Sequence, residues 1–439
     1  VYARGWLKRF IEGVLASPVL VPQTYAAFHA TERTRGIAYL PTVSYSEMNE
    51  WTLPPAAAGR YAALRVQSAP EDRPFLRGGI WRNFLSRYAE ANWMHKRMLG
   101  LSARLAASPR SAAPALQSLL HAAQANDAYW HGLFGGLYLP HLRRSVWRSL
   151  LTLEAALDDG SPTRTAGRAD VDFDGRDECF LANAELQLVL RDDGLGAVHE
   201  LSSYVLTHNF GDTLRRYPEH YHRTSDGPDS PQADPGHHGI ASAHDRHSSK
   251  TAVTLADLAT DATGRLFGTD ELLDAGGQTT ALDAWRLVDC APGQLVFAHA
   301  LGAGRLEKRW VLAGHGLTLE YAGDFPVGSR LRLALHLAMP SCDGFGGRYV
   351  LADGAIPGGF GSPLQLENAS ELRLEDAELG GRVTLAVDAP CRFEAAPLHT
   401  VSQSEAGLEK IMQGVAMRLE LPAGARRLAL SLEAIPSWL

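Results

Sequence analysis

The sequence predicts an α+β protein of several domains, in which a helical part precedes a large antiparallel β-sandwich. Three observations lead to this prediction. The chain has 439 residues, which is more than a single small core requires. Apolar residues recur at helical spacing up to about residue 157, whereas after residue 170 they alternate with polar residues. The segment between them, DDGSPTRTAGRAD (158–170), is rich in turn-forming residues and predicts a linker.

The first 55 residues have a mixed pattern. The apolar run from Ile37 to Leu40 predicts a strand. The segment SYSEMNEW that follows predicts a short helix, for which either Ser44 or Ser46 supplies the N-terminal cap. The chain opens with VYARGWLKRFIEGVL, which is typical of the middle of a fold, so we expect further residues to precede it in the parent protein.

A helical bundle is predicted over residues 56–157, because apolar residues recur there with a period near 3.6. The face of the first long helix carries Trp81, Phe84, Leu85, Tyr88, Asn92, His95 and Leu99. The second helix begins near Pro114 and carries Leu116, Leu119, Leu120 and Ala123. The third carries Leu142, Val146, Leu150, Leu153 and Leu157.

The β-sandwich is predicted over residues 170–439 from strands that have one apolar face. The alternation is clearest in ELQLVLR (185–191), RLRLALHLAM (330–339), RVTLAV (382–387) and RRLALSL (426–432). Many such strands with turn residues between them favour an antiparallel sandwich. The Pro- and Gly-rich segment RTSDGPDSPQADPGHHG (223–239) predicts a long exposed loop.

Composition excludes several classes of protein. The formal charge of −7 gives no basic face for nucleic acid, and no apolar run is long enough to span a membrane. The four cysteines are far apart, which argues against a disulfide framework or a cysteine-ligated zinc site. The sequence shows no secretory leader, so a cytoplasmic location is expected.

The segment AQANDAYWHGLFGG (123–136) predicts a sugar site. A pyranose ring needs aromatic planes for its apolar faces and polar side chains for its hydroxyls. Asp127, Tyr129, Trp130 and His131 supply both kinds of group, and the glycines that follow permit close backbone approach. The alternative is a helix end with two packed aromatic rings and a capping Asp127.

Two polar residues lie on the apolar face of the first long helix. Asn92 and His95 must find hydrogen-bond partners if they are buried. They either form a hydrogen-bonded pair in the core or line a polar cleft, with Glu90 near its edge.

The acidic segment DVDFDGRDE (170–178) predicts a structural Ca²⁺ site. Hard Ca²⁺ takes six to eight oxygen ligands, which a tight acidic loop provides. The expected ligands are Asp170, Asp172, Asp174, the carbonyl of Arg176 and Glu178. The Glu that an EF-hand carries at its twelfth position is absent, so this is not an EF-hand. The alternative is a solvated acidic turn.

Five stretches of this chain resemble glycoside hydrolase family 57, in its branch of α-amylases and 4-α-glucanotransferases. They are RGIAYLPTVSYSEMNEWTLP, GGIWRNFLSRYAEANWMHKRML, AQANDAYWHGLFGGLYLPHLRR, LSSYVLTHNFGDTLRRYPEHYH and VSQSEAGLEKIMQG. The resemblance implies a (β/α)₇ barrel, then a helical bundle, then a β-sandwich similar to that of galactose mutarotase. Residues 1–55 are then the end of the catalytic barrel, and residues 56–157 complete the active-site cleft.

The resemblance also implies retaining chemistry on α-1,4-glucosidic bonds. The Glu nucleophile and the Asp general acid/base of the family precede the segment equivalent to GWLKRF, so no catalytic residue is expected within this chain and no catalytic cofactor is needed. NDAYWHG matches the last motif of the family. By that match Asp127 and Trp130 line the donor-side glucose subsite, with His131 beside them.

The expected function is therefore the C-terminal part of a 4-α-glucanotransferase or α-amylase, whose partner is an α-glucan or a maltooligosaccharide. The sequence leaves open whether the protein forms a homo-oligomer, and it does not distinguish a transferase from a hydrolase. One alternative is a non-catalytic carbohydrate-binding or assembly module. Another is a mutarotase-like sugar epimerase that uses a histidine of the sandwich, for which His336 is the candidate.

Overall fold

The computed structural model divides the chain into two compact units, Val1–Thr42 and Val43–Leu439. It describes residues 2, 4–40, 46–132, 134–160, 162, 165–225, 252–342, 346–404, 407–422 and 426–435. Ser44 and most of the predicted loop 223–239 lie outside the described residues. No helix among the described residues is long and apolar enough to cross a membrane.

The first unit contains two short helices, α1 (Trp6–Ala16) and α2 (Tyr25–Thr31). The hydroxyl of Thr24 caps α2 by accepting a hydrogen bond from the backbone N–H of Ala27. None of the described residues in this unit is buried. The strand predicted over Ile37 to Leu40 is wrong. Both of these side chains are more than four-fifths exposed, and no described strand pairs with this run.

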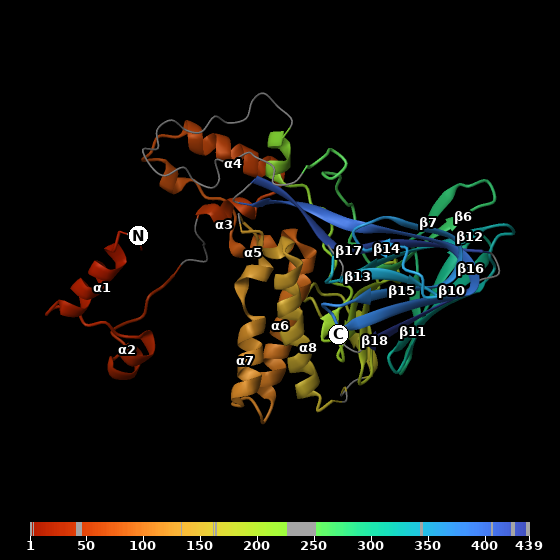
Figure 1. Ribbon diagram of the computed structural model, residues 1–439, viewed down its shortest axis with the longest axis horizontal. Helices are drawn as coiled ribbons and strands as arrows, with labels where there is room; N and C mark the ends of the chain where they lie inside the picture. The colour runs from red at the N-terminus through yellow and green to blue at the C-terminus, as the bar shows by residue number, and fades with distance from the viewer. Residues whose placement is uncertain are drawn as a thin grey trace. The chain divides into compact units, whose positions relative to one another are not determined.

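The second unit begins with a helical part (Figure 1). Its helices are α3 (Ser46–Trp51), α4 (Pro55–Gln67), α5 (Trp81–Arg87), α6 (Ala89–Ala107), α7 (Pro114–Ala123) and α8 (Pro140–Leu157), with short 3₁₀ turns η1 (Arg73–Phe75), η2 (Asn126–Tyr129) and η3 (Gly136–Tyr138). Proline occupies the first turn of α4, α7 and α8, where its missing N–H is tolerated. The short helix that was predicted for the segment SYSEMNEW is confirmed and corresponds to α3.

The single helix predicted from Trp81 onward is in fact two helices. Tyr88 leaves the helical region, with φ −109° and ψ 96°, and separates α5 from α6. This break rotates the buried face of α6, which consists of Ala91, Trp93, Met94, Met98, Leu101 and Leu105. Leu99, which was expected to be on that face, is exposed, and Asn92 and His95 are only half-buried.

The described residues of the sandwich form 18 strands, and every described strand pairing is antiparallel, as predicted. They are β1 (Ala166–Ala169), β2 (Glu178–Ala182), β3 (Leu186–Arg191), β4 (Val198–Ser203), β5 (His208–Asn209), β6 (Phe267–Leu273), β7 (Thr279–Leu282), β8 (Arg286–Ala291), β9 (Gln294–Leu301), β10 (Gly304–Ala313), β11 (Gly316–Gly323), β12 (Arg330–Leu337), β13 (Gly347–Leu351), β14 (Gly358–Gly359), β15 (Leu364–Asp376), β16 (Gly381–Ser404), β17 (Gly407–Leu421) and β18 (Arg427–Ala434). Strand β1 lies inside the segment 158–170 that was predicted to be a linker, so the sandwich begins earlier than predicted.

Two runs of paired strands share the long strand β16. One run is β1, β2, β3, β4, β6, β12, β17 and β16, and the other is β8, β9, β10, β11, β18 and β16. The first part of β16 pairs with β18, and its second part pairs with β17. Leucines on β3, β10, β11, β12, β17 and β18 meet in one apolar core. Alternation along β12 follows the prediction, since its leucines are buried and His336 is half-buried.

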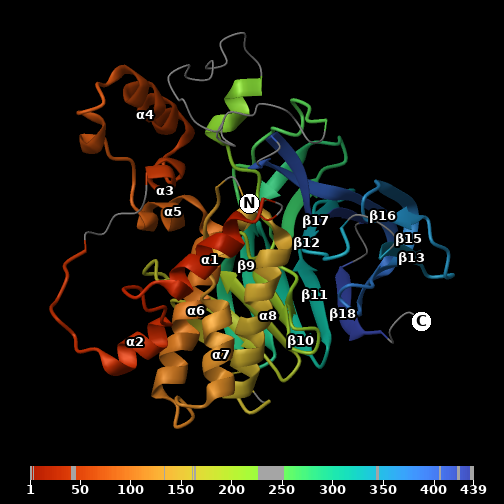
Figure 2. The ribbon, with the colours of Figure 1, turned by 60° about the vertical axis from the view of Figure 1, so that its left-hand side comes forward.

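Helix α8 packs against the sandwich at β5. Figure 2 shows α6, α7 and α8 grouped beside the strands. Apolar residues of α6, α7 and α8 form a core that also includes Val189 of β3. Buried charges cross the same boundary. Arg97 of α6 lies 2.6 Å from a carboxylate oxygen of Glu154 on α8 and 3.0 Å from one of Glu200 on β4. The helical part and the sandwich are therefore joined by paired charges as well as by apolar contacts.

Candidate functional site

The segment NDAYWHG forms a tight turn between α7 and α8. After η2 the backbone is extended at Trp130, and it turns back through Gly135 and Gly136, which have φ of +84° and +50°. A Cβ atom on Gly136 would lie 2.1 Å from the carbonyl oxygen of Trp130, so only glycine fits there. The backbone N–H of Leu137 donates to that same oxygen at 2.8 Å. Gly136 thus permits a close backbone approach within the turn, while contact between these glycines and a sugar stays a prediction.

The four candidate sugar-binding residues of this turn differ in exposure. Asp127 is exposed and Trp130 is half-buried, whereas Tyr129 and His131 are buried. The Tyr129 hydroxyl donates to the Ala123 carbonyl at 2.6 Å, and burial raises the pKa of Tyr129. Asp127 is thus accessible and Trp130 only partly so, while Tyr129 and His131 face the interior.

His131 is held by a buried chain of hydrogen bonds. Its Nε2 atom lies 2.6 Å from the Tyr88 hydroxyl, which donates to Glu219 Oε1 at 2.6 Å. Because the Tyr88 hydroxyl donates its hydrogen to Glu219, it can only accept from His131, and we therefore assign the N–H of His131 to Nε2. Its Nδ1 atom has no hydrogen-bond partner among the described residues. Burial, with a further contribution from Arg87, lowers the pKa of His131 well below its ordinary value, so the ring is neutral.

Glu219 is the centre of this network. Its carboxylate also accepts hydrogen bonds from the Tyr138 hydroxyl at 2.7 Å and from Arg87 at 2.6 Å. Burial raises the pKa of Glu219, and Arg87 opposes that rise. Arg87 also donates to the carbonyls of Trp51 and Leu53, at 3.0 and 2.7 Å. The network therefore links the end of α3, α5, η3 and the segment before η4 (His220–Ser225).

Aromatic rings enclose the same network. The Trp51 ring lies 4.8 Å from that of His131 and 5.3 Å from that of His220, in edge-to-face geometry. Sequence reasoning assigned no role to Glu219 or Trp51. Each lies at least 80 positions from His131 along the chain, so no local spacing could connect them with it.

Asn92 and His95 do not form a pair. Asn92 Nδ2 donates to the backbone carbonyl of Asp172 at 3.5 Å. The His95 ring lies 5.4 Å from that of Trp81 and 5.6 Å from that of Tyr129. Burial, with a smaller contribution from Lys96, lowers the pKa of His95 to about 4. The predicted core pair is therefore wrong, because the two side chains point to different neighbours.

The acidic loop brings three of its five expected ligands together. Asp170, Asp172 and Asp174 each offer an oxygen atom, and these atoms lie within 4.8 Å of one another. The Asp170 carboxylate also accepts the backbone N–H groups of Asp174 and Gly175, at 3.1 and 3.0 Å. The Asp172 carboxylate forms an ion pair with Arg191. The loop therefore offers oxygen ligands, but the carboxylates already accept hydrogen bonds from backbone N–H groups and pair with Arg191.

The other two expected ligands are placed differently. Glu178 is buried, and its Oε2 atom accepts the backbone N–H of Val171 at 2.7 Å. Burial, together with the nearby carboxylates of Asp174 and Asp170, raises the pKa of Glu178 to about 7. Arg176 contacts the loop through its backbone N–H, which donates to Asp174 Oδ1 at 2.8 Å. Glu178 therefore stabilises the loop from its buried side through the hydrogen bond from Val171, and it is not part of the three-carboxylate group.

His336 does not have the partner that acid–base chemistry on a sugar would require. Its Nδ1 atom lies 2.8 Å from the carbonyl oxygen of Leu266, and burial lowers its pKa to about 4. Among the described residues, no carboxylate is hydrogen-bonded to this ring.

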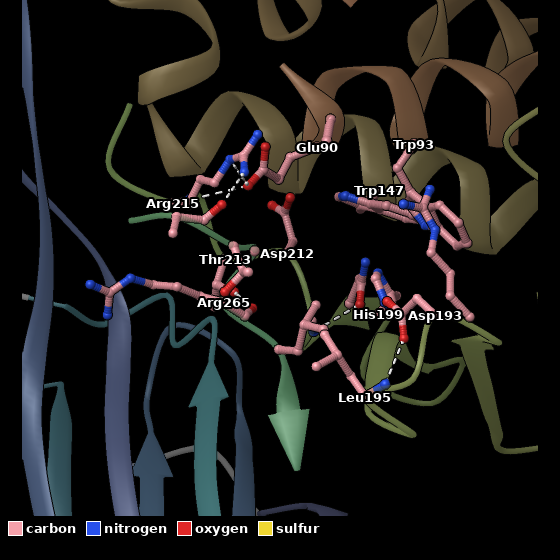
Figure 3. Close-up of a pocket in the computed structure, with 18 residues that line it drawn as sticks. Glu90, Trp93, Trp147, Asp193, Leu195, His199, Asp212, Thr213, Arg215 and Arg265 are labelled. Atoms are coloured by element: carbon pink, nitrogen blue, oxygen red, sulfur yellow. Dashed lines mark hydrogen bonds and ion pairs between the residues drawn. The ribbon is translucent and has the colours of Figure 1, made fainter. Parts of the chain in front are cut away.

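Three cavities of the described structure lie away from the NDAYWHG turn. They have volumes of about 320, 310 and 50 Å³, and neither Asp127 nor Trp130 lines any of them. The first lies between the helices and the sandwich, and Glu90 lies on its wall (Figure 3). Asn92 and His95 do not line this cavity, so it is not the polar cleft that was predicted for their helix face.

Two family models match the chain. Residues 79–157 match the middle domain of "Alpha-amylase/4-alpha-glucanotransferase", and residues 170–432 match the C-terminal domain of the same family. These ranges agree with the helical bundle and with the sandwich. Together they cover most of the chain.

Similar proteins agree with this assignment. A 4-alpha-glucanotransferase of Thermococcus kodakarensis is 33% identical over 445 residues, covering 96% of this chain and 63% of that protein. An alpha-amylase of Pyrococcus abyssi is also 33% identical, over 97% of this chain and 64% of its own length. The crystal structure of 4-alpha-glucanotransferase from Thermococcus litoralis aligns with a TM-score of 0.70 and 26% identity, over 99% of this chain and 64% of that one.

The chain thus spans slightly less than two thirds of the length of these relatives. A galactose mutarotase-like protein from Clostridium acetobutylicum also aligns, but its TM-score of 0.34 and 9% identity are too low to support an argument. The resemblance to glycoside hydrolase family 57 is confirmed by the family models and by the relatives. The chain belongs to the α-amylase/4-α-glucanotransferase family, of which it contains the middle and C-terminal domains.

Proposed function

We propose that this chain is the middle and C-terminal part of a retaining enzyme that acts on α-1,4-glucans, either a 4-α-glucanotransferase or an α-amylase. The family and the names of the similar proteins support this proposal. In this proposal the nucleophile and the acid/base belong to a part of the parent protein that precedes residue 1. The chain supplies groups that bind the glucan and groups that support the active-site cleft.

The observation that carries the proposal is the NDAYWHG turn. It presents an exposed carboxylate, Asp127, three residues before a half-buried indole, Trp130. A carboxylate suits the hydroxyl rim of a hexose, and an indole suits its apolar face. The buried His131 and the glycine turn hold both groups on a rigid support, which lowers the entropic cost of binding. Tyr129 and His131 act as positioning residues.

We further propose that residues 1–55 are the end of the catalytic barrel. Helix α1 exposes Trp6, Phe10, Ile11 and Leu15, each to at least 47%. An apolar surface of this kind usually marks a contact with another part of a protein. The expected contact here is with the rest of the barrel in the parent protein.

The experiment compares this chain with the same gene extended upstream. Both are assayed for disproportionation and for hydrolysis of maltooligosaccharides. We expect activity only in the extended form, because only that form contains the nucleophile and the acid/base. In the extended form, Asp127→Asn and Trp130→Ala each lower kcat/KM by about tenfold or more, since each removes a contact to the donor sugar.

The control is Asp283→Asn, which changes an exposed carboxylate on the sandwich and leaves kcat/KM unchanged. Full activity of Asp127→Asn in the extended form would exclude the proposed subsite. A short chain that binds maltooligosaccharides tightly, with an extended form that lacks both activities, would instead favour the non-catalytic binding module.

We also propose that the acidic loop binds a structural Ca²⁺. The three grouped carboxylates of Asp170, Asp172 and Asp174 support this proposal. A cation there offsets the mutual repulsion of the carboxylates and holds the start of β2 against the linker. It takes no part in the proposed reaction.

A further inference from the structure

The largest of the three cavities lies at the boundary between the two matched domains. Its volume is about 320 Å³, and its walls come from α6, α8, the turn between β3 and β4, and segments 209–215 and 262–266. Small-molecule sites favour such boundaries and have volumes of roughly 300 to 1,000 Å³. The size therefore suits a ligand of one or two sugar rings better than a long chain. The residues that carry the argument are Glu90, Trp93, Trp147, Asp193, His199 and Arg215.

A buried hydrogen-bond donor on the cavity wall is unused. Arg215 Nε lies 4.0 Å from Glu90 Oε1, which is too far for a hydrogen bond, and it has no hydrogen-bond partner among the described residues. Glu90 is itself fixed, because it accepts the backbone N–H of Arg215 at 3.2 Å and the hydroxyl of Tyr217. A buried donor without a partner is unfavourable, and a ligand oxygen that accepts its hydrogen would remove this penalty.

A histidine and a carboxylate form a second polar group of the cavity (Figure 3). His199 Nε2 lies 3.2 Å from Asp193 Oδ2. Burial lowers the pKa of His199, while the hydrogen bond to Asp193 opposes that change. The ring is therefore held in one orientation and is neutral near pH 7, so it interacts with a ligand as a hydrogen-bonding group and not as a cation.

The charges that line the cavity are balanced. Three carboxylates and three guanidinium groups are present, those of Glu90, Asp193, Asp212, Arg191, Arg215 and Arg265. A wall without net charge gives no advantage to an anion or a cation. It suits a neutral ligand whose hydroxyl groups both donate and accept hydrogen bonds. Trp93 and Trp147, on the other side of the cavity from Glu90 and Arg215 in Figure 3, add apolar surface.

We infer that this cavity is a second, non-catalytic binding site for a glucose or maltose unit of an α-glucan. The inference depends on the proposed function for the identity of the sugar. The site shares no residue with the NDAYWHG turn, so the two sites can be lost separately. In the parent enzyme the cavity would hold part of a glucan that is not being cleaved, which raises the local concentration of substrate.

The test measures maltose binding by isothermal titration calorimetry in a background that lacks the first site. That background is the complete chain with Asp127→Asn and Trp130→Ala. We expect it to retain maltose binding. Adding Leu195→Trp, which places an indole in the cavity from a half-buried position, raises the Kd by at least about tenfold. Ala262→Trp, at an exposed position of the cavity wall, does the same with little risk to folding.

The matched control is Leu255→Trp, which adds the same indole at an exposed leucine outside the cavity and leaves the Kd unchanged. Loss of all maltose binding in the background variant overturns this inference and leaves the proposed function intact. Unchanged binding in both tryptophan variants of the cavity also overturns it. Displacement of maltose by inorganic phosphate would assign the cavity to anions and overturn it as well. If the background variant retains binding and only the cavity variants lose it, the inference stands; the role of Asp127 is decided separately, by the activity of Asp127→Asn in the extended form.

Discussion

His131 shows how one buried side chain sets the position of exposed neighbours. Asp127 lies only four residues before it, yet Asp127 is exposed and His131 has no exposed surface. The hydrogen bonds from His131 through Tyr88 to Glu219 fix the end of the turn. A fixed turn presents Asp127 and Trp130 in one geometry, which is the requirement for a binding site.

His131 predicts a specific dependence of stability on pH. Burial lowers its pKa in the folded state below the ordinary value of 6.5, so the unfolded chain binds a proton there that the folded chain does not. The stabilisation is complete above pH 6.5 and is lost as the pH falls. Below pH 6.5 this residue should lower the free energy of unfolding by about 1.4 kcal/mol per pH unit.

Urea unfolding of wild type and His131→Gln at pH 7, 6 and 5 checks this prediction. The glutamine does not titrate, so the difference in unfolding free energy between the two proteins should shrink as the pH falls. His29→Gln, at an exposed position, should keep the pH dependence of wild type. A constant difference between wild type and His131→Gln would show that the histidine is not held neutral.

At the scale of elements, the change of period near residue 160 was the strongest signal in the sequence. Helical and strand periods depend on local backbone geometry, so they can be read without knowledge of tertiary contacts. The positions at which elements end are harder to predict. The break at Tyr88 leaves no gap in the apolar pattern, because Tyr88 is buried and both adjoining helices are amphipathic. The apolar run at Ile37 resembled a strand, but strands form only where a partner strand pairs with them.

The acidic loop before β2 gives a prediction about metal binding. Addition of Ca²⁺ should raise the melting temperature and a chelator should lower it, because a ligand that binds only the folded state stabilises it. At 100 times the dissociation constant the gain is about 2.7 kcal/mol. Asp172→Ala should remove this response to Ca²⁺, although loss of its ion pair with Arg191 also lowers the starting melting temperature.

Asp353→Ala, an exposed aspartate on a turn of the sandwich, should keep the full response to Ca²⁺. Equal melting temperatures of wild type with Ca²⁺ and with chelator would mean that the loop is held by its own backbone hydrogen bonds alone.

At the scale of the whole molecule, the buried charges couple the helical part to the sandwich. Arg97 satisfies two buried carboxylates that come from different parts, Glu154 and Glu200. Trp93 donates its indole N–H to the same Glu200 at 2.9 Å. Separation of the two parts would leave charges without partners, so residues 43–439 should unfold as one cooperative unit.

Substitution of Arg97 tests this coupling. Arg97→Met leaves Glu154 and Glu200 buried without their main partner and should lower the free energy of unfolding by about 3–5 kcal/mol. Arg104→Met removes a more exposed partner of Glu154 and should cost less than about 1 kcal/mol. Denaturant unfolding measures both effects. Equal effects of the two substitutions, or two separate transitions in wild type, would contradict the coupling.

The sequence by itself determined the order of the domains, the antiparallel sandwich, the glycine turn after NDAYWHG and the family. Each of these depends on local periodicity, on residue types at short spacing, or on likeness along the chain. The tertiary structure decided which candidate residues are accessible. It buried His131 and Tyr129, left Asp127 exposed, and separated Asn92 from His95.

The tertiary structure also assembled groups that no local pattern connects. Glu219 meets His131 through Tyr88, and the cavity joins Glu90 with His199 and Arg215 from positions more than 100 residues further along the chain. Burial and hydrogen bonding between distant residues depend on how helices and sheets pack. Packing is a property of the folded molecule, and the spacing of residues in a sequence does not encode it directly.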